Sequence, residues 1–297
     1  MTINLTESIK QRLLNYARAH QQNYNFVLRQ YVLQRSMYRL GASEYAHDFL
    51  LKGGLLFWVW QQNFHRPTQD MDLLGFGSDD IDILKAQFLS IIQVACDDGV
   101  EFKPGELTAS TIKADAKYQG VRITGKANLH KTLVPYQIDI GSGDAVPSAA
   151  TTVFLSGVPA PTLKVYPLES VIAEKFHAMV VLGFANSRMK DFFDIVTFAS
   201  TLPLESLKLQ VAIAATFTRR NTRLDHKTLE LFSAGFKADR SKQIQWQAFI
   251  TKNKLATSDS FALSVEKIEQ LLEPICENLT ADKNMNKTWD AKTWSWK

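Results

Sequence analysis

The fold is indicated most clearly by two short motifs, Lys52-Gly53-Gly54 and Asp70-Met71-Asp72, which are separated by fifteen residues. Two adjacent glycines let backbone N–H groups approach a polyphosphate closely, because no Cβ stands in the way. Asp70 and Asp72 are two residues apart, so an extended strand would direct both carboxylates to one face, where they could hold a divalent metal ion. Leu55 to Trp60 can make a buried helical turn or two. The stretch therefore predicts a glycine turn, a short helix and a strand, in that order.

Each half of this pattern also has an ordinary explanation. A Gly-Gly pair alone is most often a plain turn, and two aspartates near a strand end are usually solvated. The two halves together, in this order, favour a phosphoryl-transfer site. Asp-x-Asp after a glycine turn and a helix resembles the nucleotidyltransferase fold of the polymerase beta superfamily.

A third carboxylate candidate lies on a second predicted strand, Pro135 to Gly141. Alternation along this strand places Gln137 and Asp139 on the face opposite its apolar side chains. Three converging carboxylates repel one another unless cations lie between them, which is how a Mg²⁺ site is built. The alternative is that Asp139 merely ends a strand before the turn at 141–144.

Lys175 is the anomaly of a helix predicted over Leu168 to Gly183, because all its neighbours at i±3 and i±4 are apolar. One explanation is that the aliphatic stem of Lys175 lies along the apolar face of the helix while its ammonium reaches water. The other is that an anionic ligand or acidic side chains compensate its charge. We expect Lys175→Met to be tolerated by the fold. The next helix carries Asp191 and Asp194 one turn apart, for which favourable acid placement in a first turn is the ordinary explanation.

Five blocks of this sequence resemble the AbiEii/AbiGii toxin family of nucleotidyltransferases, in the family's order across about residues 45 to 200. They are Lys52-Gly53-Gly54, Arg66-x-Thr68-x-Asp70-x-Asp72, Gln137 to Asp144, Glu169 to His177 and Ser187 to Asp194. The resemblance implies the toxin of a bacterial toxin–antitoxin or abortive phage infection system, with a cognate antitoxin as partner. It also implies transfer of a nucleotide from an NTP, with Mg²⁺ or Mn²⁺, to an acceptor such as the 3′ end of tRNA.

The resemblance implies site residues position by position. Asp70, Asp72 and Asp139 would bind metal, and Lys175 and Asp191 would match the family's later essential lysine and aspartate. The NTP phosphates would be bound by Lys52, Gly53, Gly54, Arg66, Thr68, Lys175 and Lys190. One departure is Leu55, because many members have Ser or Thr directly after the glycine pair.

Composition excludes several other classes of protein. The chain has 297 residues, is 45% hydrophobic and contains no apolar run long enough to span a membrane, so we expect a cytoplasmic protein. Cys96 and Cys276 form no Cys-x-x-Cys motif, which argues against a disulfide framework or a zinc knuckle. Neither a His-Glu-x-x-His pair nor a Gly-Lys-Ser/Thr loop occurs, which argues against a zincin or a P-loop enzyme.

The net charge of +4 lies entirely in residues 151–297, which contain 19 basic and 15 acidic side chains. Within 208–254 the count is ten against three, with Arg219, Arg220 and Arg223 closely spaced. This density suggests a surface for RNA backbone. A solvated basic face is the alternative.

We therefore predict an α+β, polymerase beta-like domain with a mixed sheet over residues 1–165. An α-helical domain over 166–297 would complete the active site and is a candidate for docking RNA. Helices are expected over 5–40 and 80–98, and a strand pair over 121–127 and 132–140. A linker is expected over 147–167, in which 153–155 could add a strand. The tail from Asp282 has too little periodicity for a prediction. Two rival functions are a metal-dependent nuclease and a non-catalytic protein that binds RNA or a partner and retains the fold.

Overall fold

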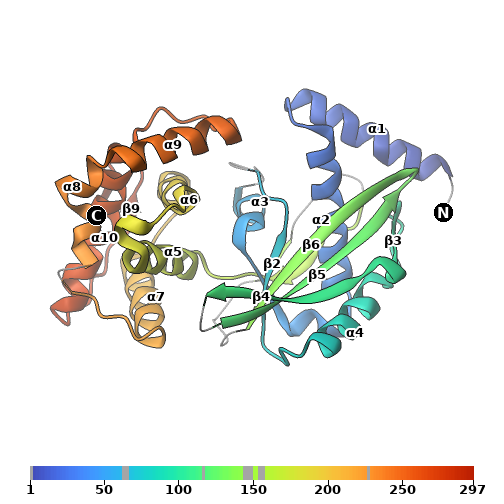
Figure 1. Cartoon of the computed structure of the whole chain (residues 1–297), viewed down its shortest axis with the longest axis horizontal. Coiled ribbons are helices and arrows are strands. Elements are labelled where there is room, and N and C mark those ends of the chain that lie inside the picture. Colours follow the sequence, from blue (N-terminus) through green and yellow to red (C-terminus); the bar gives the residue numbers. More distant parts are fainter. Residues whose placement is uncertain (1–2, 62–66, 116–117, 143–149, 153–157, 226–227) are drawn as a thin grey trace. The chain divides into compact units, whose positions relative to one another are not determined.

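The computed structural model describes residues 3–61, 67–115, 118–142, 150–152, 158–225 and 228–297. The chain separates into two compact units, Met1–Tyr166 and Pro167–Lys297 (Figure 1). The first unit combines helices with a mixed sheet, and the second is almost entirely helical. The predicted α+β fold class is confirmed. Residues 153–155, considered as an added strand, lie outside the described residues.

A mixed six-stranded sheet forms the centre of the first unit (Figure 1). Its order is β1-β2-β6-β5-β3, and β4 also pairs with β5. Strands β2 and β6 run parallel, whereas the other paired strands of this sheet are antiparallel. The predicted strand pair is confirmed as β5 and β6. The bounds are β1 (Phe49–Lys52), β2 (Met71–Gly75), β3 (Val100–Phe102), β4 (Thr108–Asp115), β5 (Tyr118–Leu129) and β6 (Thr132–Ser142), with a separate pair of β7 (Ala150–Thr152) and β8 (Thr162–Lys164).

Helices of the first unit begin and end partly where the sequence predicts. The segment expected over 5–40 is two helices, because Gln21 adopts a positive φ of 51° and the Asn23 side chain accepts the Phe26 N–H to start the second. The helix expected over 80–98 starts after its Asp80 cap but ends at Ile92. The bounds are α1 (Ile3–Ala19), α2 (Tyr24–Gly41), α3 (Leu56–Gln61) and α4 (Ile81–Ile92), with 3₁₀ turns at Glu44–His47, Gly53–Leu55 and Pro104–Glu106.

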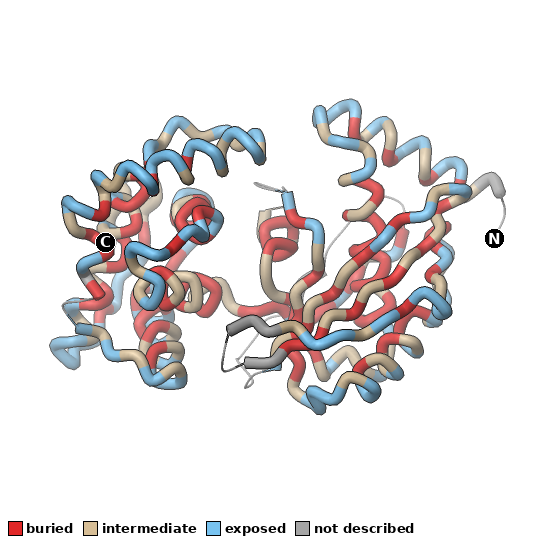
Figure 2. The backbone as a smooth tube through the Cα atoms, viewed as in Figure 1, coloured by how far each residue is buried: buried red, intermediate tan, exposed pale blue. Residues whose placement is uncertain are grey.

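Burial alternates along β5 and β6, whereas β1 and β2 are buried at most positions (Figure 2). Along β6, Tyr136, Ile138 and Ile140 are buried, whereas Gln137 and Asp139 are only half-buried. Helix α2 contacts β6, and α4 contacts β4 and β5. The residues between the buried ones therefore leave from the opposite, polar face, where the functional candidates of β2, β5 and β6 lie.

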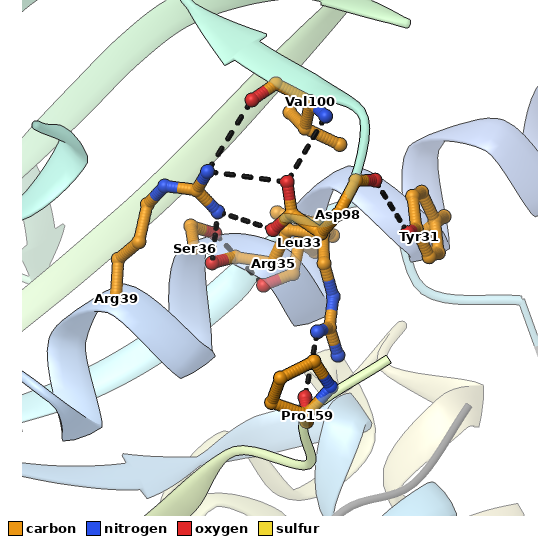
Figure 3. Close-up of polar contacts among 8 residues, drawn as sticks. All are labelled: Tyr31, Leu33, Arg35, Ser36, Arg39, Asp98, Val100 and Pro159. Atoms are coloured by element: carbon orange, nitrogen blue, oxygen red, sulfur yellow. Dashed lines mark hydrogen bonds and ion pairs between the residues drawn. The ribbon is translucent and has the colours of Figure 1, made fainter. Parts of the chain in front are cut away.

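A buried polar network ties α2 to the strand that follows α4 (Figure 3). Arg39 Nη1 lies 2.6 Å from Asp98 Oδ2, both side chains are almost fully buried, and Asp98 Oδ1 accepts the Val100 N–H. The Tyr31 hydroxyl donates to the Asp98 carbonyl at 2.7 Å. Removing one member of such a pair costs roughly 3–5 kcal/mol, because it leaves the other charge buried alone. Asp98, which the sequence placed at the end of a helix, is therefore held by α2 six residues after α4 ends.

The second unit packs its helices around phenylalanines of α6, α8 and α10, with Phe236 in ring contact with both Phe192 and Phe261. The unpredicted tail forms a two-strand hairpin in which the indole N–H groups of Trp289 and Trp296 donate to helix carbonyls. Among the described residues, no helix has the length and apolar character to cross a membrane. The bounds are α5 (Leu168–Leu182), α6 (Met189–Thr201), α7 (Ser206–Arg219), α8 (Ala234–Lys237), α9 (Arg240–Asn253), α10 (Phe261–Thr280), β9 (Trp289–Asp290) and β10 (Ser295–Trp296), with 3₁₀ turns at Gly183–Ala185 and Thr228–Phe232.

Candidate active site

Three predicted carboxylates of the first unit lie together on the polar face of the sheet. Asp72 of β2 lies directly opposite Asp139 of β6, and Asp70 immediately precedes β2. One carboxylate oxygen from each residue lies within 4.8 Å of the other two, and all three residues are half-buried. Hard oxygen donors at this separation are the ligands that Mg²⁺ and Mn²⁺ prefer. The donor set therefore fits the divalent metal that the sequence predicts.

Two cations flank the carboxylates in a single row across four strands. The register places Lys52 of β1 opposite Asp72, Asp72 opposite Asp139, and Asp139 opposite Arg122 of β5. The charges in this row are therefore positive, negative, negative and positive. Flanking cations offset part of the repulsion between the acids, which accounts for how the cluster is held in the folded chain.

Arg122 makes the most specific contact in this row, and the sequence analysis missed it. Its Nε and Nη2 atoms each donate to a different oxygen of Asp139 at 2.8 Å, and Gln137 Nε2 donates to Asp139 Oδ2 at 3.2 Å. The hydrogen bonds from Arg122 to Asp139, followed by the charges of Asp139, Asp70 and Asp72, raise the pKa of Arg122. A two-residue hairpin turn pairs Leu129 with Thr132, and seven residues from that pair on each strand are Arg122 and Asp139. The turn residues, His130-Lys131, are not the Asn-Gly or Asp-Gly pair that marks such a hairpin in a sequence, so the contact carried no clear sequence signal.

Gly53 is required by the carboxylate behind it as well as by its own backbone. Its φ is +75°, in the region that side chains disfavour, and a Cβ at this position would lie 1.9 Å from Asp72 Oδ2. Gly54 is buried at the start of the 3₁₀ turn that leads into α3. Leu55 is 1% exposed and belongs to the core, so it presents no side-chain hydroxyl to a phosphate. A phosphate contact at this turn would therefore come from the backbone.

Lys52 and Thr68 lie on different sides of the aspartates. A Cβ on Gly141 would lie 3.4 Å from Lys52 Nζ, so the ammonium lies beyond Asp72 and Asp139 along the strands. Thr68 is buried and its hydroxyl donates to Asp70 Oδ1 at 3.2 Å, while Gln30 of α2 donates to the Thr68 carbonyl at 2.6 Å. This geometry suits Thr68 to orienting Asp70. Arg66 lies outside the described residues.

In the second unit, Lys175 is held by acidic side chains. Its Nζ lies 2.8 Å from both Asp191 Oδ1 and Asp194 Oδ2, and both aspartates are almost fully buried. Arg188 Nε lies 2.7 Å from the other oxygen of Asp191. Of the explanations that the sequence left open for Lys175, compensation by acids describes this structure. Lys190, one residue before Asp191, is exposed.

One arginine of the basic segment is also engaged. Arg220 Nη1 lies 3.2 Å from His177 Nδ1, and the Thr222 hydroxyl lies 2.8 Å from His177 Nε2. Burial, and secondarily the charge of Arg220, lowers the pKa of His177 to about 4. A neutral imidazole can accept from Arg220 at Nδ1 and donate to Thr222 at Nε2. Arg219 and Arg223 are exposed.

Comparison with known proteins agrees with these motifs. The family model described as "Nucleotidyl transferase AbiEii toxin, Type IV TA system" matches residues 35–284. The chain therefore belongs to the AbiEii family and is a nucleotidyltransferase, which confirms the resemblance seen in the sequence. Membership in this toxin–antitoxin family implies an NTP substrate and an antitoxin partner.

Two solved structures from Helicobacter pylori are similar to this chain at 14% identity. JHP933 matches with a TM-score of 0.48 over 85% of this chain and 94% of its own. A protein described as a "putative nucleotidyltransferase" matches with a TM-score of 0.49 over 85% of this chain and 96% of its own. No curated protein matches the chain.

Proposed function

We propose that this protein is a Mg²⁺-dependent toxin that transfers a nucleoside monophosphate from an NTP to a hydroxyl group of RNA, with the 3′ end of tRNA as the first candidate acceptor. The observation that carries the proposal is the cluster of Asp70, Asp72 and Asp139 next to a glycine turn. This combination suits phosphoryl transfer, since its catalysis consists mainly of positioning and of stabilising charge on phosphate oxygens.

Asp70, Asp72 and Asp139 would hold the divalent metal. When bound there, Mg²⁺ would neutralise the triphosphate and the leaving pyrophosphate. Thr68 orients Asp70, and the close approach of Gly53 fixes Asp72 against the turn. Mn²⁺ has the same ligand preference and is an alternative metal.

The chain's own groups would bind the donor at the turn. Backbone N–H groups at Gly53 and Gly54 and the ammonium of Lys52 suit the β- and γ-phosphates, because they place donors and positive charge beside the carboxylate cluster. The acceptor oxygen would bond to the α-phosphorus as the bond to pyrophosphate breaks. Asp139 would orient or deprotonate the acceptor hydroxyl.

The hydrogen bonds of Asp139 support Oδ1 as the atom that would take this proposed role. Each carboxylate oxygen has two lone pairs. Within the described part of the chain, Oδ2 accepts from both Arg122 and Gln137, whereas Oδ1 accepts from Arg122 alone. Oδ1 is therefore the oxygen with capacity for the metal or for the acceptor.

Lys175, Lys190 and Asp191 are proposed to serve the reaction on the strength of the family resemblance. Their unit would also carry the RNA-docking segment with Arg219 and Arg223. The cellular role that follows from this activity is growth arrest in the cytoplasm, restrained by the antitoxin, as a defence against phage.

The experiment that tests the proposal is incubation of the protein with each α-labelled NTP in turn, Mg²⁺ and total bacterial RNA, followed by gel separation. Label entering one RNA class would support the proposal and would identify donor and acceptor together. RNA that is shortened without gaining label would favour the nuclease alternative. Label on protein alone would refute the RNA acceptor.

A further inference from the structure

A groove of about 450 Å³ opens on the first unit beside the carboxylate cluster. It is lined by Thr124–Lys126 of β5, Pro135–Gln137 of β6 and Asp70. Arg29 of α2, Gln69 and Glu106 also line it. Its volume falls within the range of pockets that bind small molecules and cofactors.

The groove and Lys52 lie at opposite ends of the cluster. Along β6, Gln137 lines the groove, Asp139 belongs to the cluster, and Gly141 lies next to Lys52 Nζ. Asp70, which also lines the groove, comes before Asp72, the strand partner of Lys52. A molecule in the groove therefore approaches the cluster from the side opposite Lys52.

The in-line geometry of phosphoryl transfer indicates from which side the acceptor reaches the cluster. The attacking oxygen and the leaving oxygen lie on opposite sides of the phosphorus in phosphoryl transfer. If the pyrophosphate leaves towards Lys52 and Gly53, as the proposed function has it, the acceptor hydroxyl must arrive from the groove. This step rests on the proposed function. The groove itself is present whichever reaction the enzyme performs.

The charges in the groove indicate which acceptor it takes. Arg29 Nη1 donates to Gln69 Oε1 at 2.6 Å, and both residues line the groove. Lys126 Nζ lies 3.0 Å from Glu106, and these side chains are 44% and 51% exposed. An exposed pair of this kind is worth roughly 0–1 kcal/mol, so a phosphate can replace Glu106 at low cost. A protein hydroxyl carries no phosphate that would use two cations, whereas a nucleic-acid end does.

We propose that this groove binds the terminal nucleotide of a single-stranded RNA end, with Arg29 and Lys126 on its phosphodiester and with its 3′-hydroxyl directed to the carboxylate cluster. Thr124, whose hydroxyl also bonds the Thr108 hydroxyl, and Gln137, whose Nε2 also donates to Asp139, line the groove and carry groups of the kind that bond a ribose or base edge. Arg29 and Lys126 are binding residues in this account. The chemistry remains with the aspartates.

Binding of a 5′-labelled single-stranded ten-nucleotide RNA, measured by fluorescence anisotropy between 50 and 300 mM salt, tests the groove without NTP. The double variant Arg29→Gln/Lys126→Gln should weaken binding about tenfold or more at low salt and lower the salt slope by roughly 0.7, since the two cations bind one phosphodiester and each single-strand phosphate contact contributes about 0.7. Lys126→Gln alone should show about half the change in slope. The matched control is Arg18→Gln/Lys85→Gln, which removes two charges of α1 and α4 that do not line the groove.

Binding of a non-hydrolysable NTP and label transfer separate this inference from the proposed function. NTP affinity should be the same in the groove variant as in the wild type, while the KM for the acceptor rises. Unchanged RNA affinity and salt slope in the folded groove variant would overturn the groove, even if nucleotide transfer stands. Absence of transfer by a wild type whose RNA binding depends on Arg29 and Lys126 would overturn the proposed reaction and leave the groove as an RNA site.

Discussion

Gly53→Ala should damage the first unit and its metal site together. The added Cβ would lie 1.9 Å from Asp72 Oδ2 and 2.6 Å from Asp72 Cγ, and real Cβ contacts are essentially never closer than 3.0 Å. The carboxylate must therefore retreat by about 1.1 Å, the difference between 3.0 and 1.9 Å. Metal ligands tolerate displacements of only ~0.2 Å, so Asp72 would no longer bind with the other two acids.

The expected size of the effect follows from two contributions. A φ of +75° costs a residue with a side chain roughly 1–2 kcal/mol, and overpacking against Asp72 costs roughly 1–3 kcal/mol. The free energy of unfolding should fall by about 2–5 kcal/mol, and Tm by roughly 4–20 °C. A 1 Å misplacement at a catalytic group costs about a hundredfold in rate, so transfer should fall at least that far.

Thermal melting, Mn²⁺ titration by electron paramagnetic resonance and label transfer measure the three effects. Gly77→Ala is the matched control, because a Cβ there meets nothing within 4 Å, and it should stay within about 0.5 kcal/mol of wild type. Gly53→Asn should recover part of the backbone cost, since Asn tolerates positive φ, but not Mn²⁺ binding. A Gly53→Ala protein with wild-type Tm and Mn²⁺ affinity would refute the reasoning.

Three further predictions concern charged groups. Arg122→Met should lower Tm in the absence of Mg²⁺ and enlarge the gain in Tm when Mg²⁺ is added, because the metal then compensates Asp139; an equal gain in wild type and variant would count against this role. Lys175→Met should cost about 3–5 kcal/mol by leaving two buried aspartates short of a cation, contrary to the tolerance expected from sequence; melting indistinguishable from that of Lys190→Met, an exposed control, would contradict it. The pKa of His177 in the folded chain is about 4, below its ordinary value, so the unfolded chain takes up the proton first as pH falls. The free energy of unfolding should therefore fall by up to about 3 kcal/mol as pH drops from 6.5 to 4. His177→Gln should flatten that part of a Tm-against-pH curve, and an unchanged curve would exclude the histidine as its cause.

The candidate carboxylates were predictable from local patterns, because alternation along a strand places Asp72 and Asp139 each on the face opposite its apolar neighbours. That the two strands pair, and so bring Asp139 to Asp70 and Asp72, was implied by the family resemblance. The glycine turn and the short helix after it follow from Gly53-Gly54 and the apolar run that begins at Leu55. These patterns span few residues, so no tertiary information is needed to read them.

Arg122 and the partners of Lys175 depend on which elements pair. The contact between Arg122 and Asp139 requires the hairpin register as well as the two strands, and alternation within each strand leaves that register open. Lys175 lies on α5 and its two aspartates on α6, so the packing of two helices decides its environment. Hydrophobic periodicity identifies each helix but not the rotation of one against the other.

The tail was unpredictable for a different reason. Its tryptophans follow neither helical nor strand periodicity, because indole N–H bonds to the carbonyls of Ala199 and Leu271 and a two-residue strand pair hold it. The break between α1 and α2 likewise depends on a positive φ at Gln21, a conformation that few residues other than glycine adopt.

The most direct test of the central claim is label transfer from α-labelled NTP to bacterial RNA by Asp70→Ala. The variant should remain folded, with a Tm level with or above that of the wild type, because one of three repelling carboxylates is removed. It should transfer no label in Mg²⁺, whereas Asp79→Ala, an exposed aspartate outside the cluster, should transfer as the wild type does. Near-normal transfer by folded Asp70→Ala would contradict the assignment of this carboxylate cluster as the catalytic centre.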